Sequence, residues 1–264
     1  MTREEKALIF DVQRFCVHDG PGIRSTVFFK GCNMRCAWCH NPESFSQRPE
    51  LLFRPEKCTA CGACEACPSG AHRRENGSHS FHRENCSGCG VCASLCPNGA
   101  LELSGREMTV EEVMKELRKD DKYYAASGGG VTLSGGEASI WFNFVRELLD
   151  ACKSQGFHTA LETNGLISAE RLEALIPRTD LFLFDCKHTD PEAHLHWTGA
   201  PLQPVLDSLQ ALDRAGAKVI LRCPIIPGVN DGEAHFAALR DIREKYASIQ
   251  QVEVMAYHDI GRGK

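Results

Sequence analysis

The feature that most constrains how this chain can fold is an internal cysteine repeat. The stretch "CTACGACEACPSGA" at 58–71 is echoed by "CSGCGVCASLCPNGA" at 86–100, and a polar, His-rich spacer separates them. A segment this short buries little apolar surface by itself, so it needs metal sites to hold it together. The repeat therefore predicts a small unit, stabilised by bound metal, within the chain of 264 residues.

The spacing of the repeat is close to the C-x2-C-x2-C-x3-C-P run of two-cluster ferredoxins, in which the last cysteine of each run ligates the other cluster. This pattern assigns one [4Fe–4S] cluster to Cys58, Cys61, Cys64 and Cys96, and a second to Cys86, Cys89, Cys92 and Cys67. In one departure, Cys64 and Cys67 are separated by two residues instead of three. The alternative is a pair of structural zinc sites, because C-x2-C pairs also suit tetrahedral zinc. The Cys-Pro ending of both runs favours iron–sulfur.

A second cysteine group lies in "GCNMRCAWCHNP", which begins at Gly31 and ends at Pro42. Cys32, Cys36 and Cys39 have the spacing C-x3-C-x2-C. Three thiolates would leave one iron of a cubane cluster with an open coordination position, which a small chelating ligand can fill. The alternative is a buried cysteine stripe on a helix, but the flanking glycine and proline disfavour a long helix there.

The composition places the chain among ordinary proteins of the cytosol. A net charge of −5 provides no basic excess for nucleic acid. No apolar run reaches the length of a membrane span, and the N-terminus lacks the apolar core of a signal peptide. In the cytosol, fifteen cysteines indicate metal ligation more than disulfides. The four outside the two groups are expected to be packed thiols: Cys16, Cys152, Cys186 and Cys223.

Outside the cysteine repeat, expected strands and helices alternate. The strands are expected at 25–31, 131–135, 158–163, 180–186, 218–223 and 251–257. The helices are expected at 109–124, with Thr109 as N-cap, and at 140–156, 168–176, 205–216 and 232–246. About six βα units with short links predict a parallel α/β sheet or partial barrel, which carries its chemistry at the C-terminal ends of the strands.

The C-x3-C-x2-C loop after the first strand of such a chain resembles the radical S-adenosylmethionine (SAM) superfamily. The resemblance implies a partial (β/α)6 TIM-like barrel over 1–49 and 105–264, and a ferredoxin-like insert with two clusters over 50–104. It also implies that the open iron binds the amino and carboxylate groups of SAM. An electron from the cluster then cleaves the sulfonium to methionine and a 5′-deoxyadenosyl radical.

Further stretches are similar to the activating enzymes of glycyl radical enzymes, in the subgroup with such an insert. They are "HDGPGIRS" at 18–25, "WCHNPES" at 38–44, "SGGE" at 134–137, "ETNG" at 162–165, "DCKH" at 185–188, "RCPIIPGVND" at 222–231 and "YHDIGRGK" at 257–264. The chain ends soon after His258, earlier than is usual in this family, which predicts that a C-terminal piece is missing.

The resemblance assigns SAM contacts to Asn41, Gly135, Gly136, Glu137, Glu162, Asp185, Lys187, Arg222 and His258. In it Lys187 complements the SAM carboxylate, and Glu162 lies where a monovalent cation can also bind. Ala138 stands where the family usually has proline. For the glycine pair the alternative is a tight turn, and for His258 it is a structural role. Asp19 is either a turn residue or a contact to the partner's glycine loop.

These features favour an activating enzyme that takes a hydrogen atom from a glycine of a glycyl radical enzyme. Its expected cofactors are three [4Fe–4S] clusters and SAM, and its expected reductant is a flavodoxin or ferredoxin. We expect a cytoplasmic monomer that binds neither nucleic acid nor membrane. The alternatives are a radical SAM enzyme acting on a small molecule, and a non-catalytic electron carrier that uses only the insert clusters. The carrier leaves the three-cysteine loop unexplained.

Overall fold

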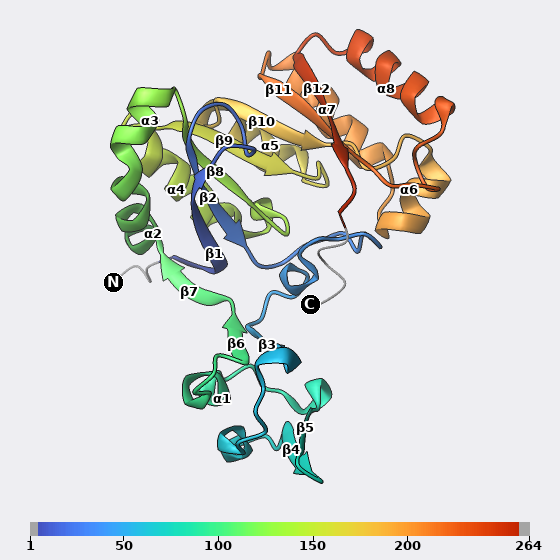
Figure 1. The fold of residues 1–264 in the computed structure, drawn as a ribbon. Coiled ribbons are helices and arrows are strands. Elements are labelled where there is room, and N and C mark those ends of the chain that lie inside the picture. Colours follow the sequence, from blue (N-terminus) through green and yellow to red (C-terminus); the bar gives the residue numbers. More distant parts are fainter. Residues whose placement is uncertain (1–4, 259–264) are drawn as a thin grey trace.

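The computed structural model describes residues 5–258, and it contains one eight-stranded sheet in the order β12-β11-β10-β9-β8-β2-β1-β7 (Figure 1). The strands are β1 Lys6–Cys16, β2 Arg24–Phe29, β7 Arg106–Thr109, β8 Gly130–Gly135, β9 His158–Thr163, β10 Leu181–Asp185, β11 Val219–Ile225 and β12 Ile249–Ala256. From β2 to β12 all neighbouring strands are parallel. These six parallel strands confirm the predicted α/β fold. The antiparallel strands β1 and β7 extend the sheet and were not predicted.

The helices of the barrel follow the expected order with small changes. They are α2 Val110–Leu117, α3 Asp121–Ser127, α4 Phe142–Ser154, α5 Ala169–Leu175, α6 Pro191–Thr198, α7 Gln203–Arg214 and α8 Glu233–Lys245. Thr109 is confirmed as an N-cap: its hydroxyl accepts the Glu112 N–H at 3.2 Å, and the Glu112 carboxylate accepts the Thr109 N–H at 2.8 Å.

The helix expected over 109–124 is broken by a 3-10 turn at Arg118–Asp120. The break brings Asp120 into the interior, where its carboxylate accepts hydrogen bonds from Arg14 and Ser25 on the sheet. The short α6 was not predicted, because the sequence "PEAHLHWT" has little apolar periodicity.

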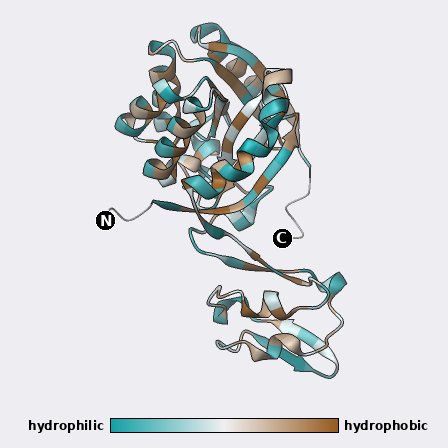
Figure 2. Ribbon diagram, turned by 90° about the vertical axis from the view of Figure 1, so that its left-hand side faces the viewer, coloured by the Kyte–Doolittle hydropathy of each residue, from teal (hydrophilic) through white to brown (hydrophobic). Residues whose placement is uncertain are grey.

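The two faces of the parallel sheet carry different side chains. Leu161, Phe182 and Leu221 belong to the large core between the sheet and its helices, and Figure 2 shows hydrophobic residues concentrated on the strands. Residues whose side chains point to the other face of the sheet form a separate small cluster: Ala160, Leu181, Leu183 and Ile220. Two residues further along β9, β10 and β11, the same face carries Glu162, Asp185 and Arg222. The inner face of the barrel is therefore apolar along the strands and charged at their C-terminal ends.

The cysteine repeat forms a separate lobe, which Figure 1 shows joined to the barrel through β3 and β6. β3 Glu50–Phe53 and β6 Leu101–Ser104 are the first and last strands of the lobe, and they pair as an antiparallel ribbon. Between them the lobe contains β4 His72–Glu75, β5 Ser78–Phe81 and α1 Val91–Leu95. Its buried hydrophobic cluster contains only Leu51, Cys92 and Leu101 among the described residues. So small a core agrees with a lobe held together by metal sites.

Among residues 5–258, every helix is too short or too polar to cross a bilayer.

Candidate functional site

A cavity of ≈ 340 Å³ opens at the C-terminal ends of the parallel strands. Its lining contains eleven of the thirteen residues that the sequence assigns to the barrel site: Asp19, Cys32, Cys36, Cys39, Asn41, Gly135, Gly136, Glu162, Asp185, Lys187 and Arg222. These residues come from the ends of β8, β9, β10 and β11 and from loops far apart in sequence. We call this space the barrel cavity.

Two assigned residues, Glu137 and His258, have other positions. Glu137 is 1% exposed and lies behind the wall, where its carboxylate accepts hydrogen bonds from the Thr163 hydroxyl at 3.1 Å and the Asn164 N–H at 2.9 Å. Burial raises the pKa of this carboxyl, and its hydrogen-bond donors oppose that rise. Its role in this structure is to hold the turn after β8 against the end of β9. His258 is exposed beyond β12, whereas Tyr257 lines the barrel cavity. Residues 259–264 of the last family stretch lie outside the described residues.

The three cysteines lie in an irregular loop, residues 31–41, which we call the cysteine loop. Residues 32–41 contain no helix, so a helical cysteine stripe is excluded. The loop is braced by α6, because the Thr198 carbonyl accepts the Arg35 N–H at 2.7 Å and the Trp197 carbonyl accepts the Ala37 N–H at 3.0 Å. The sequence did not predict this contact, because it did not predict α6.

Burial raises the pKa of Cys32, Cys36 and Cys39, whereas the nearby Lys187 charge lowers the pKa of each. Thiols in this environment are protonated when free, so a bound metal must displace their protons. Three convergent thiols beside a cavity, with a cation among them, fit a cluster held by three thiolates.

Two ion pairs line the barrel cavity at the strand ends. Lys187 Nζ lies 2.9 Å from Asp185 Oδ2, and an Arg222 nitrogen lies 2.6 Å from Glu162 Oε1. Burial opposes the Lys187 charge, but Asp185 and Cys36 outweigh it and raise the pKa of the ammonium group. Burial raises the pKa of Glu162, while the Arg222 charge lowers it. With Asp19, the wall carries two cations and three carboxyl groups, which suits a ligand with charges of both signs.

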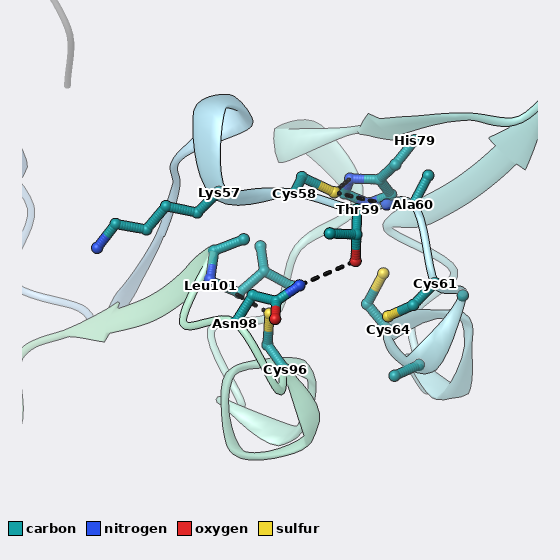
Figure 3. Close-up of a pocket in the computed structure, with 13 residues that line it drawn as sticks. Lys57, Cys58, Thr59, Ala60, Cys61, Cys64, His79, Cys96, Asn98 and Leu101 are labelled. Atoms are coloured by element: carbon teal, nitrogen blue, oxygen red, sulfur yellow. Dashed lines mark hydrogen bonds between the residues drawn. The ribbon is translucent and has the colours of Figure 1, made fainter.

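In the lobe, a second cavity is lined by Cys58, Cys61, Cys64 and Cys96, the set assigned to one cluster from the sequence (Figure 3). Cys58 Sγ accepts the Ala60 N–H at 3.4 Å, and Cys96 Sγ accepts the Ala100 N–H at 3.3 Å. Four thiols around one cavity, two of which receive backbone N–H groups, fit a thiolate-held iron–sulfur cluster.

The short spacing between Cys64 and Cys67 is absorbed by a change of helix type. Ala63–Ala66 form a 3-10 turn in which the Cys67 N–H bonds to the Cys64 carbonyl at 3.1 Å. The matching segment of the second run is the α-helix α1, with one residue more. A 3-10 helix has three residues per turn, so one residue fewer still completes the turn.

Comparisons with known proteins decide the family. Residues 83–239 match the model of the radical SAM superfamily, and residues 50–97 match that of a 4Fe-4S dicluster domain. The chain is 38% identical over 272 residues to the (2S)-3-sulfopropanediol dehydratase activating enzyme of Klebsiella oxytoca, covering 100% of this chain and 86% of that protein. The chain belongs to the radical SAM activating enzymes of glycyl radical enzymes.

Other similar proteins agree with this family assignment. The trans-4-hydroxy-L-proline dehydratase activating enzyme of Clostridioides difficile is 40% identical over 260 residues, covering 97% of this chain and 86% of that protein. Among solved structures, Streptococcus suis SuiB bound to precursor peptide SuiA has a TM-score of 0.52 at 16% identity, over 61% of this chain and 36% of SuiB. This likeness shows the fold alone. The superfamily model begins at residue 83, whereas the match to the Klebsiella oxytoca activating enzyme covers the whole of this chain and so includes the cysteine loop.

Proposed function

We propose that this activating enzyme cleaves SAM at the barrel cavity and takes a hydrogen atom from a glycine of a partner glycyl radical enzyme. The observation that carries the proposal is the convergence of three thiols, two ion pairs and two glycines on one cavity. Cys32, Cys36 and Cys39 would hold a [4Fe–4S] cluster, which supplies the electron that splits SAM into methionine and a 5′-deoxyadenosyl radical.

The glycine pair at the end of β8 lets the backbone approach both β2 and the cysteine loop. A Cβ atom on Gly136 would lie 2.2 Å from the Gly31 carbonyl oxygen, and one on Gly135 would lie 2.3 Å from the Phe29 nitrogen. Gly135 also has a φ of +112°, a region open to glycine but not to L side chains. We propose that this close-packed turn presents backbone groups to the amino-acid end of SAM, together with Asn41.

The ion pairs complement the charges of SAM. Lys187 is placed to attract the carboxylate, and the acidic oxygens of Asp185 and Glu162 suit the amino and sulfonium charges. A monovalent cation near Glu162 would be held by the same carboxylate. Since Arg222 and Lys187 keep these carboxylates paired beforehand, SAM binding exchanges one ion pair for another and leaves no buried charge unpaired.

Asp19 is proposed to meet the partner's glycine loop at the rim. Its carboxylate accepts a hydrogen bond from the Thr26 hydroxyl at 2.7 Å, and its carbonyl accepts one from the Thr132 hydroxyl at 2.7 Å. The loop that carries Asp19 is thereby tied to β2 and β8 while the residue still lines the barrel cavity. Glycine suits the substrate position because it has no side chain to block its α-carbon and can adopt conformations closed to other residues.

The lobe at 50–104 is proposed to hold two further [4Fe–4S] clusters, for three in all, and to receive electrons from a flavodoxin or ferredoxin. Cys86, Cys89, Cys92 and Cys67 would hold the second of its clusters. We further propose a cytoplasmic monomer that binds neither nucleic acid nor membrane.

The test is an anaerobic reaction of the reduced enzyme and SAM with candidate glycyl radical enzymes. A reasonable panel is the enzymes served by its relatives, such as the (2S)-3-sulfopropanediol and trans-4-hydroxy-L-proline dehydratases. The expected result is the electron paramagnetic resonance doublet of a glycyl radical in one of them, absent when the candidate glycine is changed to alanine. No doublet with any partner, together with a small molecule that accelerates 5′-deoxyadenosine formation, would support the small-molecule alternative instead.

A further inference from the structure

The cavity of the lobe contains a histidine beside its four cysteines. His79 on β5 lines the cavity, and one of its nitrogens, Nδ1, lies 3.7 Å from Cys58 Sγ (Figure 3). A ring nitrogen is also within 4.8 Å of Cys64 Sγ. Since four thiolates already fill the four ligand positions of a cubane, the imidazole is surplus as a ligand. It is placed instead as a hydrogen-bond donor to sulfur.

A second histidine determines which nitrogen of His79 carries the proton. His72 Nδ1 lies 2.9 Å from His79 Nε2, and the two ring planes are inclined by 24° with centroids 5.1 Å apart, as an in-plane N–H···N hydrogen bond requires. A thiolate bound to iron can only accept, so His79 Nδ1 must donate to Cys58; in the neutral ring Nε2 then accepts from His72. His72 Nε2 is buried and has no hydrogen-bond partner among the described residues. This nitrogen carries no proton when Nδ1 of the neutral ring is the donor, so it leaves no N–H group unpaired. The direction of the hydrogen-bond chain is His72 to His79 to Cys58.

This donor breaks the symmetry of the cysteine repeat. Cys58 Sγ accepts the Ala60 N–H, and the equivalent Cys86 Sγ accepts the Gly88 N–H, both at 3.4 Å. No imidazole hydrogen bond reaches Cys86 or the other cysteines of its set within residues 5–258. The equivalent cysteines Cys58 and Cys86 therefore have the same backbone donor. Each set also has one side-chain group at a sulfur: the His79 imidazole faces Cys58, and the Ser69 hydroxyl lies 3.3 Å from Cys67 Sγ in the other set.

We propose that His79 raises the reduction potential of the cluster held by Cys58, Cys61, Cys64 and Cys96. Reduction adds one negative charge that is shared by the sulfurs, and a hydrogen bond to sulfur stabilises the more negative state. The imidazole therefore favours an electron from a one-electron donor residing on this cluster. The inference rests on the proposed assignment of two clusters to the lobe.

The experiment is an anaerobic redox titration of the full-length holoenzyme with dithionite, followed by electron paramagnetic resonance. His79→Phe keeps a ring against Phe53 and His72 but removes the donor. We expect the equilibrium constant for reduction of the Cys58 cluster to fall roughly tenfold, which lowers its midpoint potential by about 59 mV for one electron. The other two clusters should keep their midpoints, and the barrel cluster is recognised by its spectral change on adding SAM.

Three further variants distinguish the loss of the hydrogen-bond donor from the loss of the imidazole ring. His79→Asn places an amide donor near the former Nδ1 position, so its midpoint should stay near that of the wild type. His72→Phe removes the hydrogen bond that His79 accepts, so its midpoint should move in the same direction as His79→Phe but by less. The matched control is His82→Phe, because within residues 5–258 the His82 side chain bonds only to Ser80 and Glu84.

Full iron content and three unchanged midpoints in His79→Phe would overturn the proposal. Loss of about four irons from that variant would also overturn it, since His79 would then be a cluster ligand. Zinc in the lobe of the wild-type protein, or only about four irons in the whole chain, would instead remove the cluster assignment on which the inference rests.

Discussion

Asn164 Nδ2 lies 2.9 Å from Asn33 Oδ1, so two asparagine side chains join the end of β9 to the cysteine loop. Asn33 in turn donates to the Leu166 carbonyl at 2.6 Å, and Asn164 Nδ2 is also 3.8 Å from Cys32 Sγ. The backbone of Asn164 is held by Glu137 from behind the wall. A buried carboxylate, a strand end and the cysteine loop are thus linked in one chain of hydrogen bonds.

Asn164→Ala should slow SAM cleavage more than it reduces iron content. Removing the amide frees the cysteine loop from β9, and a shift of about 1 Å between reacting groups can cost up to roughly 100-fold in rate. The measurement is 5′-deoxyadenosine formed per bound cluster with dithionite as reductant. Asn143→Ala, on the exposed face of α4, is the matched control and should behave as wild type. Wild-type rates in Asn164→Ala would show that the link is unimportant for catalysis.

Cys36→Ala should abolish SAM cleavage and remove about four of about twelve irons, because two thiolates cannot anchor the barrel cluster. Iron and sulfide analysis after anaerobic reconstitution measures the loss. Cys152→Ala changes a buried thiol on α4 far from both cysteine groups in sequence, so it should keep the full iron content. Cleavage at the wild-type rate by Cys36→Ala would contradict the assignment.

Lys187→Met should weaken SAM binding by roughly tenfold or more while leaving the iron content unchanged. The substitution removes the cation proposed to face the SAM carboxylate and leaves Asp185 without its 2.9 Å partner. Equilibrium binding of SAM to the anaerobic, oxidised protein measures the change. Lys153→Met is the control: its ion pair with Asp180 at 2.5 Å is half-exposed and outside the barrel cavity. Equal affinities for SAM in the two variants would be evidence against a role for Lys187.

Asp120→Asn should lower the free energy of unfolding of the barrel by about 1 kcal/mol, because the buried carboxylate that accepts hydrogen bonds from the exposed Arg14 and from Ser25 loses its charge. The Arg14 hydrogen bond holds the pKa of Asp120 below its ordinary value. Its stabilisation is therefore complete above the unfolded-state pKa of about 3.9 and is lost only as the pH falls through the lower folded-state pKa.

Denaturant titrations of wild type and Asp120→Asn at pH 8 and pH 5 check this sign. The difference between the two proteins should be the same at both pH values. A difference that disappears between pH 8 and pH 5 would mean that Asp120 titrates far above the range expected for an ion-paired carboxylate.

Local sequence was sufficient for the features that depend on spacing along the chain. The intervals between cysteines predicted the cysteine loop and the lobe, and period-2 and period-3.6 patterns predicted the six parallel strands and the Thr109 cap. The family resemblance assigned most of the residues that line the barrel cavity, and the strand pattern agreed with it, because parallel strands end at one edge of the sheet.

Tertiary structure decided which polar groups face the barrel cavity and what supports them. Glu137 follows its strand as the other assigned residues do, yet the turn at Gly135 and Gly136 directs it behind the wall. Asn33, the α6 brace and His79 obtain their partners from residues 131, 163 and 21 positions away in sequence. Spacing along the chain is a local property, whereas these contacts depend on how strands pair and how loops pack on them, so the sequence pattern could not locate them.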